Sequence, residues 1–385
     1  MRLGDCCKTN LHTYSDKEKW SLIRYLDTGS ITEGRIDEIQ TLYPGVDKIP
    51  SRARRKASVG DILFSTVRPN QKHYGIIEAG TENLLVSTGF TVVTVDTTIA
   101  DPYFIYYYLT QSSVIESLQA IAEQSTSTYP SIKPSDIEDI ELDLPELETQ
   151  KKIGSTLRML DRKIALNEEI NDNLQQQAAS IFVEWLNTCT DFSTIGDMAH
   201  NILDYSPVGS EQIRLLNSSD VTEGVFPIAP LVPNKDLKGH FKKRFKFGDI
   251  LYSEIRPRNH HYGFVLFDAS DYIASTRLMV IRAIENKVSP AMLYQYLLLP
   301  EVEAEFTLKT ESRSGTFPQG NYADMASIRV PYSPTDSQVA ISETLTQIRY
   351  TIAQNQLESQ RLAELRDTLL PKLMSGEIDV SAVQL

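Results

Sequence analysis

Two patterns of hydrophobic and polar residues occupy the chain, and each of them occurs twice. About the first 140 residues mix short β-branched and aromatic runs, such as DILFSTV and GFTVVTV, with turn-forming residues. A stretch typical of a helix follows Pro102, and its counterpart in the second half of the chain follows Pro290. Short strands mixed with a helix predict an α+β unit in each half.

A long helix is predicted to follow each α+β unit. From Gln150 on, apolar or small residues recur at alternating spacings of four and three, which is the spacing of a coiled coil. We expect Pro371 and Gly376 to end the second helix. The predicted seam positions are Ile153, Leu157, Leu160, Ile164, Asn167 and Leu174 in the first helix and Ile341, Leu345, Ile348, Ile352, Asn355 and Leu362 in the second.

Asparagine occupies core positions of this seam at Asn167, Asn171 and Asn355. An asparagine in an apolar seam lowers stability but fixes the register, because its amide requires a polar partner. We expect Asn167 and Asn355 to meet in an antiparallel helix pair; the alternative is that each faces solvent at a frayed edge. A helix of about 36 residues is about 54 Å long at 1.5 Å per residue. Each helix can therefore act as a spacer between the two α+β units.

The two halves of the chain are copies of one unit. The segment GDILFSTVRPNQKHYG (60–75) recurs 188 positions later as GDILYSEIRPRNHHYG (248–263), with ten of sixteen positions identical. RYLDTGSITEG (24–34) recurs as RLLNSSDVTEG (214–224), so we predict a tandem duplication of a unit of about 190 residues. The expected boundaries are 1–146 for the first globular domain, 147–188 for the central helix, 189–335 for the second domain and 336–385 for the distal helix and tail.

The composition indicates a soluble, acidic protein. Lys and Arg number 38 against 51 Asp and Glu, which gives a net charge of -13, and no long apolar run predicts a membrane span. No signal-peptide pattern opens the chain and the three cysteines form no C-x-x-C pair, so the expected location is the cytoplasm. Taken alone, the charge of -13 argues against nucleic-acid binding, which requires a basic surface.

Basic residues are nevertheless concentrated at two equivalent places, each directly before a GDIL segment. The three residues RRK (54–56) fall on KKR (242–244) at the offset of 188. One such cluster alone is more often a solvated loop, but two equivalent clusters favour contact with phosphates, which bind Lys and Arg side chains. The predicted phosphate-contacting residues are Arg52, Arg54, Arg55, Lys56, Lys242, Lys243, Arg244 and Lys246.

Two further pairs of segments carry side chains suited to base or phosphate contacts. RPNQKHYG and RPRNHHYG each supply an arginine, whose fork can bind a guanine edge, with a histidine and a tyrosine. The alternative is a turn whose arginine pairs with a carboxylate and whose tyrosine packs. The loops QSTSTYPSIK (124–133) and ESRSGTFPQGN (311–321) are rich in hydroxyl and amide groups, which suit DNA but also any exposed loop. The candidates from these segments are Arg68, His73, Tyr74, Ser127, Thr128, Arg256, His261, Tyr262, Arg313 and Thr316.

Catalytic motifs are missing from the sequence. It contains no phosphate-binding loop, dinucleotide fingerprint or H-E-x-x-H, and its six histidines are not spaced as metal ligands, so we predict neither catalytic residues nor a metal site. DPYF (101–104) is superficially similar to the D-P-P-Y type of motif in adenine methyltransferases but lacks the second proline. Asp or Ser followed by Pro, as at 101–102 and 289–290, predicts a helix cap and first helical position instead.

Three features together carry a family resemblance over nearly the whole chain. They are the duplicated GDIL and RP segments, the helix start LPELETQKKIGSTLRMLDRKIALNEEI (144–170) and the ending LLPKLMSGEIDV (369–380). On these features the chain resembles the DNA specificity (S) subunits of type I restriction-modification systems. It departs from that family in having Pro-Glu at 145–146 where a double proline is common, and a looser second helix start, SPTDSQVAI (333–341).

The resemblance implies two target-recognition domains separated by two long antiparallel coiled-coil helices, each domain reading half of a split double-stranded DNA target. It implies that the helices dock two methyltransferase subunits, which supply catalysis and bind S-adenosylmethionine. Restriction subunits, which combine an ATP-driven motor with a nuclease, would then direct cleavage, and the chain itself would bind no cofactor. Because the two domains differ widely outside their shared segments, we expect an asymmetric target.

Three alternatives to this function stay open at the level of sequence. The first is a specificity adaptor of another DNA-modification or defence complex. The second is a DNA methyltransferase with unfamiliar motifs, which would methylate DNA without a partner. The third is a structural coiled-coil scaffold with ligand-binding end domains, which would not show sequence-selective, salt-dependent DNA binding.

Overall fold

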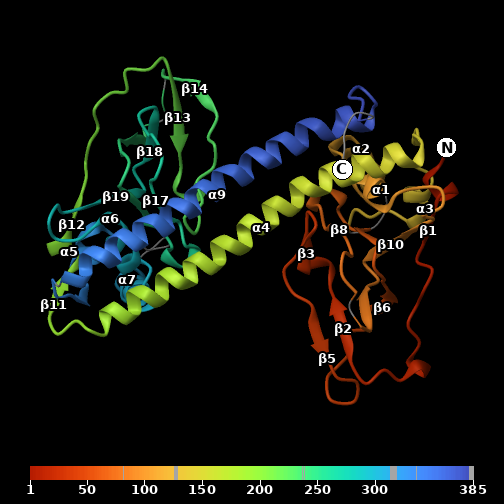
Figure 1. Cartoon of the computed structure of the whole chain (residues 1–385), viewed down its shortest axis with the longest axis horizontal. Coiled ribbons are helices and arrows are strands. Elements are labelled where there is room, and N and C mark those ends of the chain that lie inside the picture. Colours follow the sequence, from red (N-terminus) through yellow and green to blue (C-terminus); the bar gives the residue numbers. More distant parts are fainter. Residues whose placement is uncertain are drawn as a thin grey trace. The chain divides into compact units, whose positions relative to one another are not determined.

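The protein folds into two compact units that share both long helices. The computed structural model describes residues 1–80, 82–124, 129–235, 237, 239–312, 319–334 and 336–380. One unit consists of Met1–Lys163 and Leu362–Leu385, and the other of Ile164–Arg361. Helix α4 (Leu147–Leu186) and helix α9 (Asp336–Met374) each contribute one part to each unit (Figure 1).

Two four-stranded sheets form the α+β part of the first unit. The first sheet is antiparallel, in the order β1 (Cys7–Thr9), β10 (Phe90–Val95), β7 (Ile62–Ser65) and β8 (Tyr74–Ile76). The second sheet has a parallel central pair, in the order β5 (Gln40–Leu42), β2 (Ile23–Leu26), β9 (Leu84–Ser87) and β6 (Ala53–Lys56). The other elements are β3 (Ile31–Thr32), β4 (Arg35–Ile36), α1 (Pro102–Leu109), α2 (Ser112–Glu123), α3 (Pro134–Glu138) and the short 3-10 helices η1 (Leu3–Asp5), η2 (Asp16–Glu18), η3 (Thr28–Ser30) and η4 (Pro69–Gln71).

The second unit repeats the same strand order. Its antiparallel sheet runs β12 (Ala199–Asn201), β19 (Leu278–Ala283), β16 (Ile250–Ser253) and β17 (Tyr262–Phe264). Its other four-stranded sheet runs β14 (Leu231–Pro233), β13 (Gln212–Leu216), β18 (Tyr272–Ser275) and β15 (Phe241–Lys243), again with a parallel central pair, β13 and β18. The other elements are β11 (Phe192–Thr194), β20 (Arg329–Pro331), α5 (Ile195–Met198), α6 (Pro290–Leu297), α7 (Pro300–Glu311), α8 (Tyr322–Ala326), η5 (Ser218–Asp220) and η6 (Pro257–Asn259). The predicted duplication of an α+β fold is therefore confirmed.

Helices α1 and α6 begin as their sequences predict. The Asp101 carboxylate accepts a hydrogen bond from the Phe104 amide at 2.9 Å, and the Ser289 hydroxyl accepts one from the Met292 amide at 3.2 Å. A proline follows each capping residue at the first helical position, where its missing N–H costs nothing. DPYF is thus the start of a helix, as expected for a cap.

The long helices belong to the hydrophobic cores of both units. In the first unit, Ile153 and Leu157 of α4 are buried with Ile62 and Phe64 of β7 and with Phe104 of α1. In the second unit, the α4 side chains of Phe182 and Trp185 pack with Leu345 and Ile348 of α9, and Phe182 contacts the ring of Tyr296 at 4.8 Å between centroids. The twelve predicted seam residues are all buried or half-buried.

The sequence led us to expect that Pro371 would end helix α9. The helix instead continues to Met374. A proline inside a helix removes one backbone hydrogen bond. Here Leu369, Leu370, Leu373 and Met374 all pack into the core of the first unit, on both sides of the proline. We attribute the continued helix to the burial of these side chains, which offsets the lost bond.

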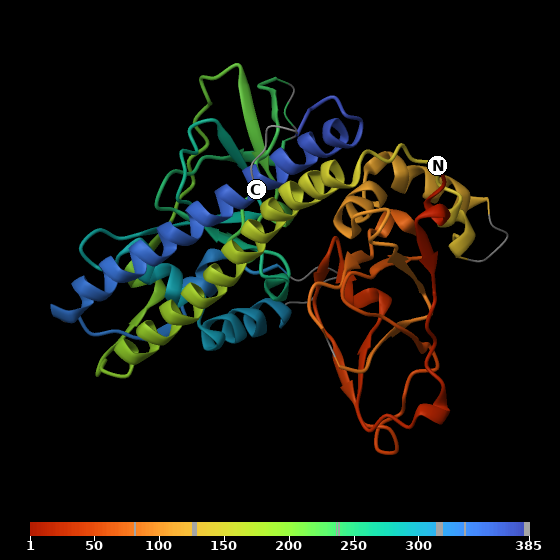
Figure 2. The ribbon, with the colours of Figure 1, turned by 45° about the vertical axis from the view of Figure 1, so that its right-hand side comes forward.

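The seam asparagines form a buried polar cluster within the second unit. Asn167 is fully buried, and its amide donates to the Asn355 carbonyl at 3.4 Å and to Glu358 Oε2 at 2.8 Å. The Asn355 amide donates to Asn171 Oδ1 at 2.9 Å. As residue numbers rise along α4 they fall along α9, so the helices run antiparallel, and Figure 2 shows them side by side in yellow-green and blue. The predicted meeting of Asn167 and Asn355 is confirmed.

Candidate nucleic-acid interface

Both predicted basic clusters lie on edge strands. Arg54 to Lys56 belong to β6 and Lys242 and Lys243 to β15, each the last strand of its sheet. The register of β6 slips between Ala53 and Arg55, and that of β15 slips between Phe241 and Lys243. A bulge at the same place in both strands leaves Arg54 and Lys242 as the extra residues.

Several cations of the first cluster are already engaged within the protein. Lys56 Nζ lies 2.5 Å from Glu18 Oε2 and 5.2 Å from the centroid of the Trp20 ring. The hydrogen bond from Lys56 lowers the pKa of Glu18, so that this partner is anionic at neutral pH. Burial lowers the pKa of Arg55, whose side chain is half-buried, and Arg54 also has contacts within the protein. Arg52 is the exposed cation of this cluster.

Lys243 is wrongly placed among the phosphate-contacting candidates. Its side chain is buried, Nζ donates to the Leu278 carbonyl at 2.7 Å and lies 3.6 Å from Glu254 Oε1. Burial also lowers the pKa of Lys243. The alternation of a strand explains the error, because neighbouring side chains point to opposite faces and Lys242 and Arg244 remain accessible. Lys246 is exposed as well.

The arginines of the two RP segments occupy identical turns. Arg68 and Arg256 both have φ of 48° and directly precede η4 and η6. Both side chains are exposed, and the Arg68 guanidinium lies 5.5 Å from the centroid of the Tyr129 ring. The turn therefore presents one arginine from each unit to the surrounding solvent.

The histidines and tyrosines of the same segments make hydrogen bonds and packing contacts within the protein. His73 Nδ1 lies 2.7 Å from the Ile31 carbonyl oxygen, and His261 Nδ1 lies 2.9 Å from that of Val221. Tyr74 is buried against the ring of Phe64, burial raises its pKa, and Tyr262 is half-buried against Tyr252. The Tyr74 ring packs as the alternative describes, while the residue also lines a pocket with Tyr106 and Arg366, so its contact with DNA stays a prediction.

Contacts with the sequence TEG (32–34 and 222–224) explain why HYG (73–75 and 261–263) recurs in both halves. Gly34 donates its amide to the Tyr74 carbonyl at 2.8 Å, and Gly224 does the same to Tyr262 at 2.9 Å. Both glycines have φ of +84°, and a Cβ atom on them would lie 2.7 Å and 2.9 Å from the hydroxyls of Tyr106 and Tyr294. Only glycine adopts this conformation without strain in so little space.

Backbone hydrogen bonds link the candidate segments of the first unit into one surface. Thr88 donates to the Arg52 carbonyl at 2.9 Å, and the next residue, Gly89, accepts from the Thr66 amide at 2.8 Å. The Thr66 carbonyl accepts from Ile132 at 2.9 Å, and Arg68 donates to the Pro130 carbonyl at 3.0 Å. The basic cluster, the RP turn and the polar loop are thus brought together, although they are far apart in the sequence.

The second unit has equivalent links. Thr276 donates to the His240 carbonyl at 2.7 Å, Glu254 to Arg277 at 2.9 Å and Gly320 to Glu254 at 2.9 Å. Exposed Arg277 adds a cation here that the sequence comparison missed, because Gly89 occupies its place in the first unit. Four candidates from the polar loops, Ser127, Thr128, Arg313 and Thr316, lie outside the described residues.

Arg282 is a second cation that the repeat could not reveal. It replaces Thr94 of the first unit, and its Nε and Nη2 atoms donate to both carboxylate oxygens of fully buried Asp249 at 2.6 and 2.8 Å. In the first unit, Asp61 instead accepts from the Thr94 hydroxyl at 2.6 Å. The positive charge of Arg282 has no counterpart in the first unit, because Thr94 occupies the equivalent position.

His260 gives the second unit a pH-dependent contact. Its Nδ1 and Nε2 atoms lie 3.0 Å from Glu223 and 2.9 Å from Glu303, and the hydrogen bond with Glu223 raises the pKa of His260. A raised pKa stabilises the fold below the unfolded-state pKa of about 6.5, and this contribution is lost as pH rises through the folded-state pKa. We expect His260→Gln to lower stability at pH 6 more than at pH 8.5, by less than about 1 kcal/mol because the pair is part-exposed.

Urea unfolding at the two pH values measures this difference. Lys72 pairs with Glu33 at the equivalent place in the first unit, and this pair contains no histidine. Lys72→Gln is therefore the matched control and should cost the same at pH 6 and pH 8.5. An equal loss for His260→Gln at both pH values would contradict the assignment.

Two other kinds of feature are not found among the described residues. No group of three or more His, Cys, Asp or Glu among them could hold a metal ion. Neither the long helices nor any shorter helix in the described ranges has an apolar stretch sufficient to cross a bilayer.

Comparisons with known proteins agree with the duplicated architecture. Residues 48–176 and 228–366 match the family described as the type I restriction modification DNA specificity domain. The type I restriction enzyme HindI specificity subunit of Haemophilus influenzae is 29% identical over 202 residues, which are 52% of this chain and 43% of that protein. The type I restriction enzyme MjaIX specificity subunit of Methanocaldococcus jannaschii is 23% identical over 345 residues, 83% of this chain and 78% of that protein.

A solved structure shares the fold. The crystal structure of the type I restriction-modification system S subunit from M. genitalium covers 97% of this chain and 95% of its own, with 16% identity and a TM-score of 0.61. At this identity the likeness concerns the fold alone.

Proposed function

Since the chain belongs to the type I restriction modification DNA specificity family, whose domain it carries twice, we propose that it reads DNA for a type I restriction-modification complex and catalyses no reaction itself. The observation that carries the proposal is the duplication: two units with one strand order, each with a basic edge strand, built on two shared helices. A reader of a split target needs two similar but unequal binding surfaces.

Each unit is proposed to bind one half of a bipartite, asymmetric site on double-stranded DNA. Residues 1–146 and 189–335 would serve as the recognition domains, and 147–188 and 336–385 as the helical parts. In support, the linked segments of each unit present exposed arginines, Arg52 and Arg68 in the first and Arg256 and Arg277 in the second. Guanidinium groups suit both phosphates and guanine edges.

The partners follow from the family. The long helices would dock two methyltransferase subunits, which bind S-adenosylmethionine, and restriction subunits with ATP-driven motor and nuclease activity would complete the complex in the cytoplasm. A different effector complex is the alternative, and co-purification from cells distinguishes the two. A purified chain that methylates DNA alone would instead favour a methyltransferase.

Genome-wide mapping of N6-methyladenine, with and without the gene, tests the proposal. We expect one bipartite motif with a fixed unread spacer to lose methylation throughout the genome, and complementation with the gene to restore it. A methylome that is unchanged in cells expressing the complete system would overturn the proposal.

A further inference from the structure

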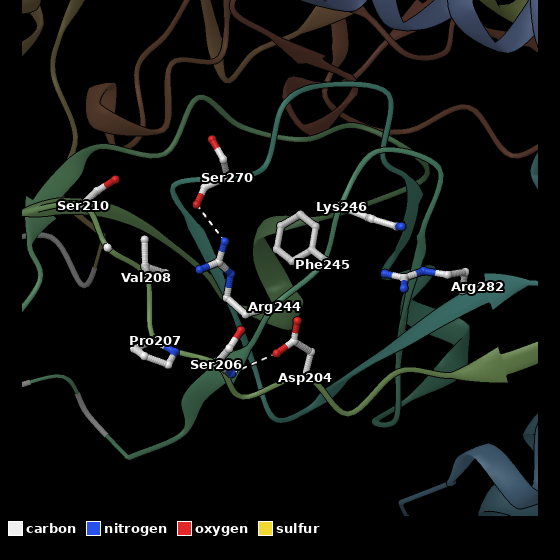
Figure 3. Close-up of a pocket in the computed structure, with 11 residues that line it drawn as sticks. Asp204, Ser206, Pro207, Val208, Ser210, Arg244, Phe245, Lys246, Ser270 and Arg282 are labelled. Atoms are coloured by element: carbon white, nitrogen blue, oxygen red, sulfur yellow. Dashed lines mark hydrogen bonds between the residues drawn. The ribbon is translucent and has the colours of Figure 1, made fainter.

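A cation-lined hollow of about 580 Å³ lies in the second unit, beside the end of β15 (Figure 3). Arg244 and Lys246 come from the segment that follows β15, and Arg282 comes from β19. The loop that contains Asp204 and Ser206 forms one wall, and Ser270 forms another. Two segments that are far apart in the sequence thus bring three cations to one hollow.

Two of these cations have no anionic partner among the residues that the structure describes. Arg244 donates from Nη2 to the Ser270 carbonyl at 2.8 Å, and its buried Nε atom has no hydrogen-bond partner in the described part of the chain. Lys246 is exposed, and no carboxylate in the described ranges lies within ion-pair distance of its ammonium. A guanidinium has five N–H donors, so Arg244 keeps several for a ligand.

The carboxylates near the hollow do not neutralise it. Asp204 lies in its wall, where its Oδ1 accepts from the Ser206 amide at 2.9 Å. Hydrogen bonds from Ser206, with smaller contributions from Arg244 and Arg282, lower the pKa of Asp204. Asp249 is occupied by Arg282. With Arg282 paired to Asp249, Arg244 and Lys246 remain beside one wall carboxylate, Asp204, a surplus that favours a ligand with several anionic oxygens.

The equivalent place in the first unit lacks this surplus. Lys56 takes the position of Arg244 but pairs with Glu18 and lies over Trp20. Ser58 and Thr94 stand where the second unit has Lys246 and Arg282. The difference arose although both edge strands kept their bulge and their basic residues, so among the described residues this set of cations belongs to the second unit.

We propose that the hollow of Arg244, Lys246 and Arg282 binds a phosphate of the DNA backbone, and that only the second unit holds its half-site in this way. The inference rests on the proposed function, because it takes DNA as the ligand. An Arg fork and a Lys point charge in one concave site match a phosphodiester, and the exposed Lys242 continues the basic surface along β15. Binding of the second half-site would then depend more strongly on salt than binding of the first.

The test measures DNA affinity of the complex with its methyltransferase subunits as a function of salt. The variant Arg244→Gln with Lys246→Gln removes two charges and keeps most of the side-chain volume, while Arg282 is left to pair with Asp249. We expect about tenfold weaker binding of target and unrelated duplexes alike, and a log–log salt slope reduced by about 1, because the hollow binds one phosphate. Lys246→Gln alone, at an exposed position, should reduce the slope by less than the double variant does.

Three further variants sharpen the result. Lys287→Gln removes an exposed charge of the second unit outside the hollow and controls for net charge. Lys56→Gln tests the equivalent position, and its effect on the slope should be less than half that of Arg244→Gln. Glu18→Gln, which frees Lys56, should strengthen binding and raise the slope.

The outcomes separate this inference from the function on which it rests. An unchanged slope for the double variant, with its fold intact by circular dichroism, would overturn the phosphate site. Binding of inorganic phosphate or ATP that the double variant loses, while its DNA slope stays unchanged, would assign the hollow to a small ligand and also overturn it. A parent complex without target preference would contradict the proposed function, yet a reduced slope in the variant would still support the phosphate site.

Discussion

Replacing Asp249 with asparagine is expected to destabilise the second unit by about 2 to 3 kcal/mol. The carboxylate is fully buried, accepts two hydrogen bonds from Arg282 and a third from the Lys246 amide at 2.8 Å. Asparagine keeps the shape but turns an NH₂ group toward one of these donors, and Arg282 loses its charge partner. The cost is smaller than is usual for a broken buried pair because the Arg282 side chain is 32% exposed.

Hydrogen exchange of the amides of β16 and β19, followed by mass spectrometry, measures this loss locally. Asp61→Asn is the matched control, because Asp61 occupies the same place in the first unit but has only neutral donors, Thr94 and Ser58. Burial raises the pKa of Asp61, so its charge is a cost at neutral pH that the asparagine removes. We expect a change within about 1 kcal/mol there; equal losses in both units would contradict the argument.

The bond between Asn355 and Asn171 is expected to show strong coupling in a double-mutant cycle. Either change to leucine leaves the other amide without its partner in the seam, at a cost of about 1 to 2 kcal/mol. Changing both places an apolar pair in an apolar seam, so the double variant should be about as stable as the parent or more stable. The coupling energy is then about 2 to 4 kcal/mol.

Urea unfolding of the four proteins gives the coupling. Gln354→Leu, at an exposed position next to Asn355, controls for the added leucine and should change stability little. Additive losses from the two changes would show that these asparagines do not depend on each other. Asn167 is left in place because its amide has Glu358 as a separate partner.

The architecture could be predicted from the sequence because the duplication is visible as repeated segments at a nearly constant spacing. Equal spacing of GDIL, RP and the seam residues required equal strand orders and two similar helices, and the seam asparagines required a polar partner in an apolar setting. The continuation of α9 through Pro371 was not predictable, because it depends on the packing of Leu369 and Leu373 against a core from the other end of the chain.

The candidate site was harder to predict, for a physical reason. Identity between the halves marks what both folds need, and Tyr74 is buried while His73 holds a neighbouring loop. Under the proposed function the two units read different half-sites, and they must then differ where they touch DNA. Arg277 and Arg282 correspond to a glycine and a threonine in the first unit, so comparing the two halves of the sequence did not reveal them. Only the structure shows that they lie beside the candidate segments.

The division of the chain into units has a consequence for protein synthesis. The second unit is continuous, Ile164–Arg361, whereas the first needs Leu362–Leu385 as well, and Leu373 and Val380 are buried in its core. At about 5 to 20 residues per second, a ribosome takes about 10 to 40 s to pass from the end of the first segment to the start of the last. The first unit therefore begins to be translated first but receives its last segment after the second unit is complete. Its apolar core stays open on the ribosome while the second unit folds.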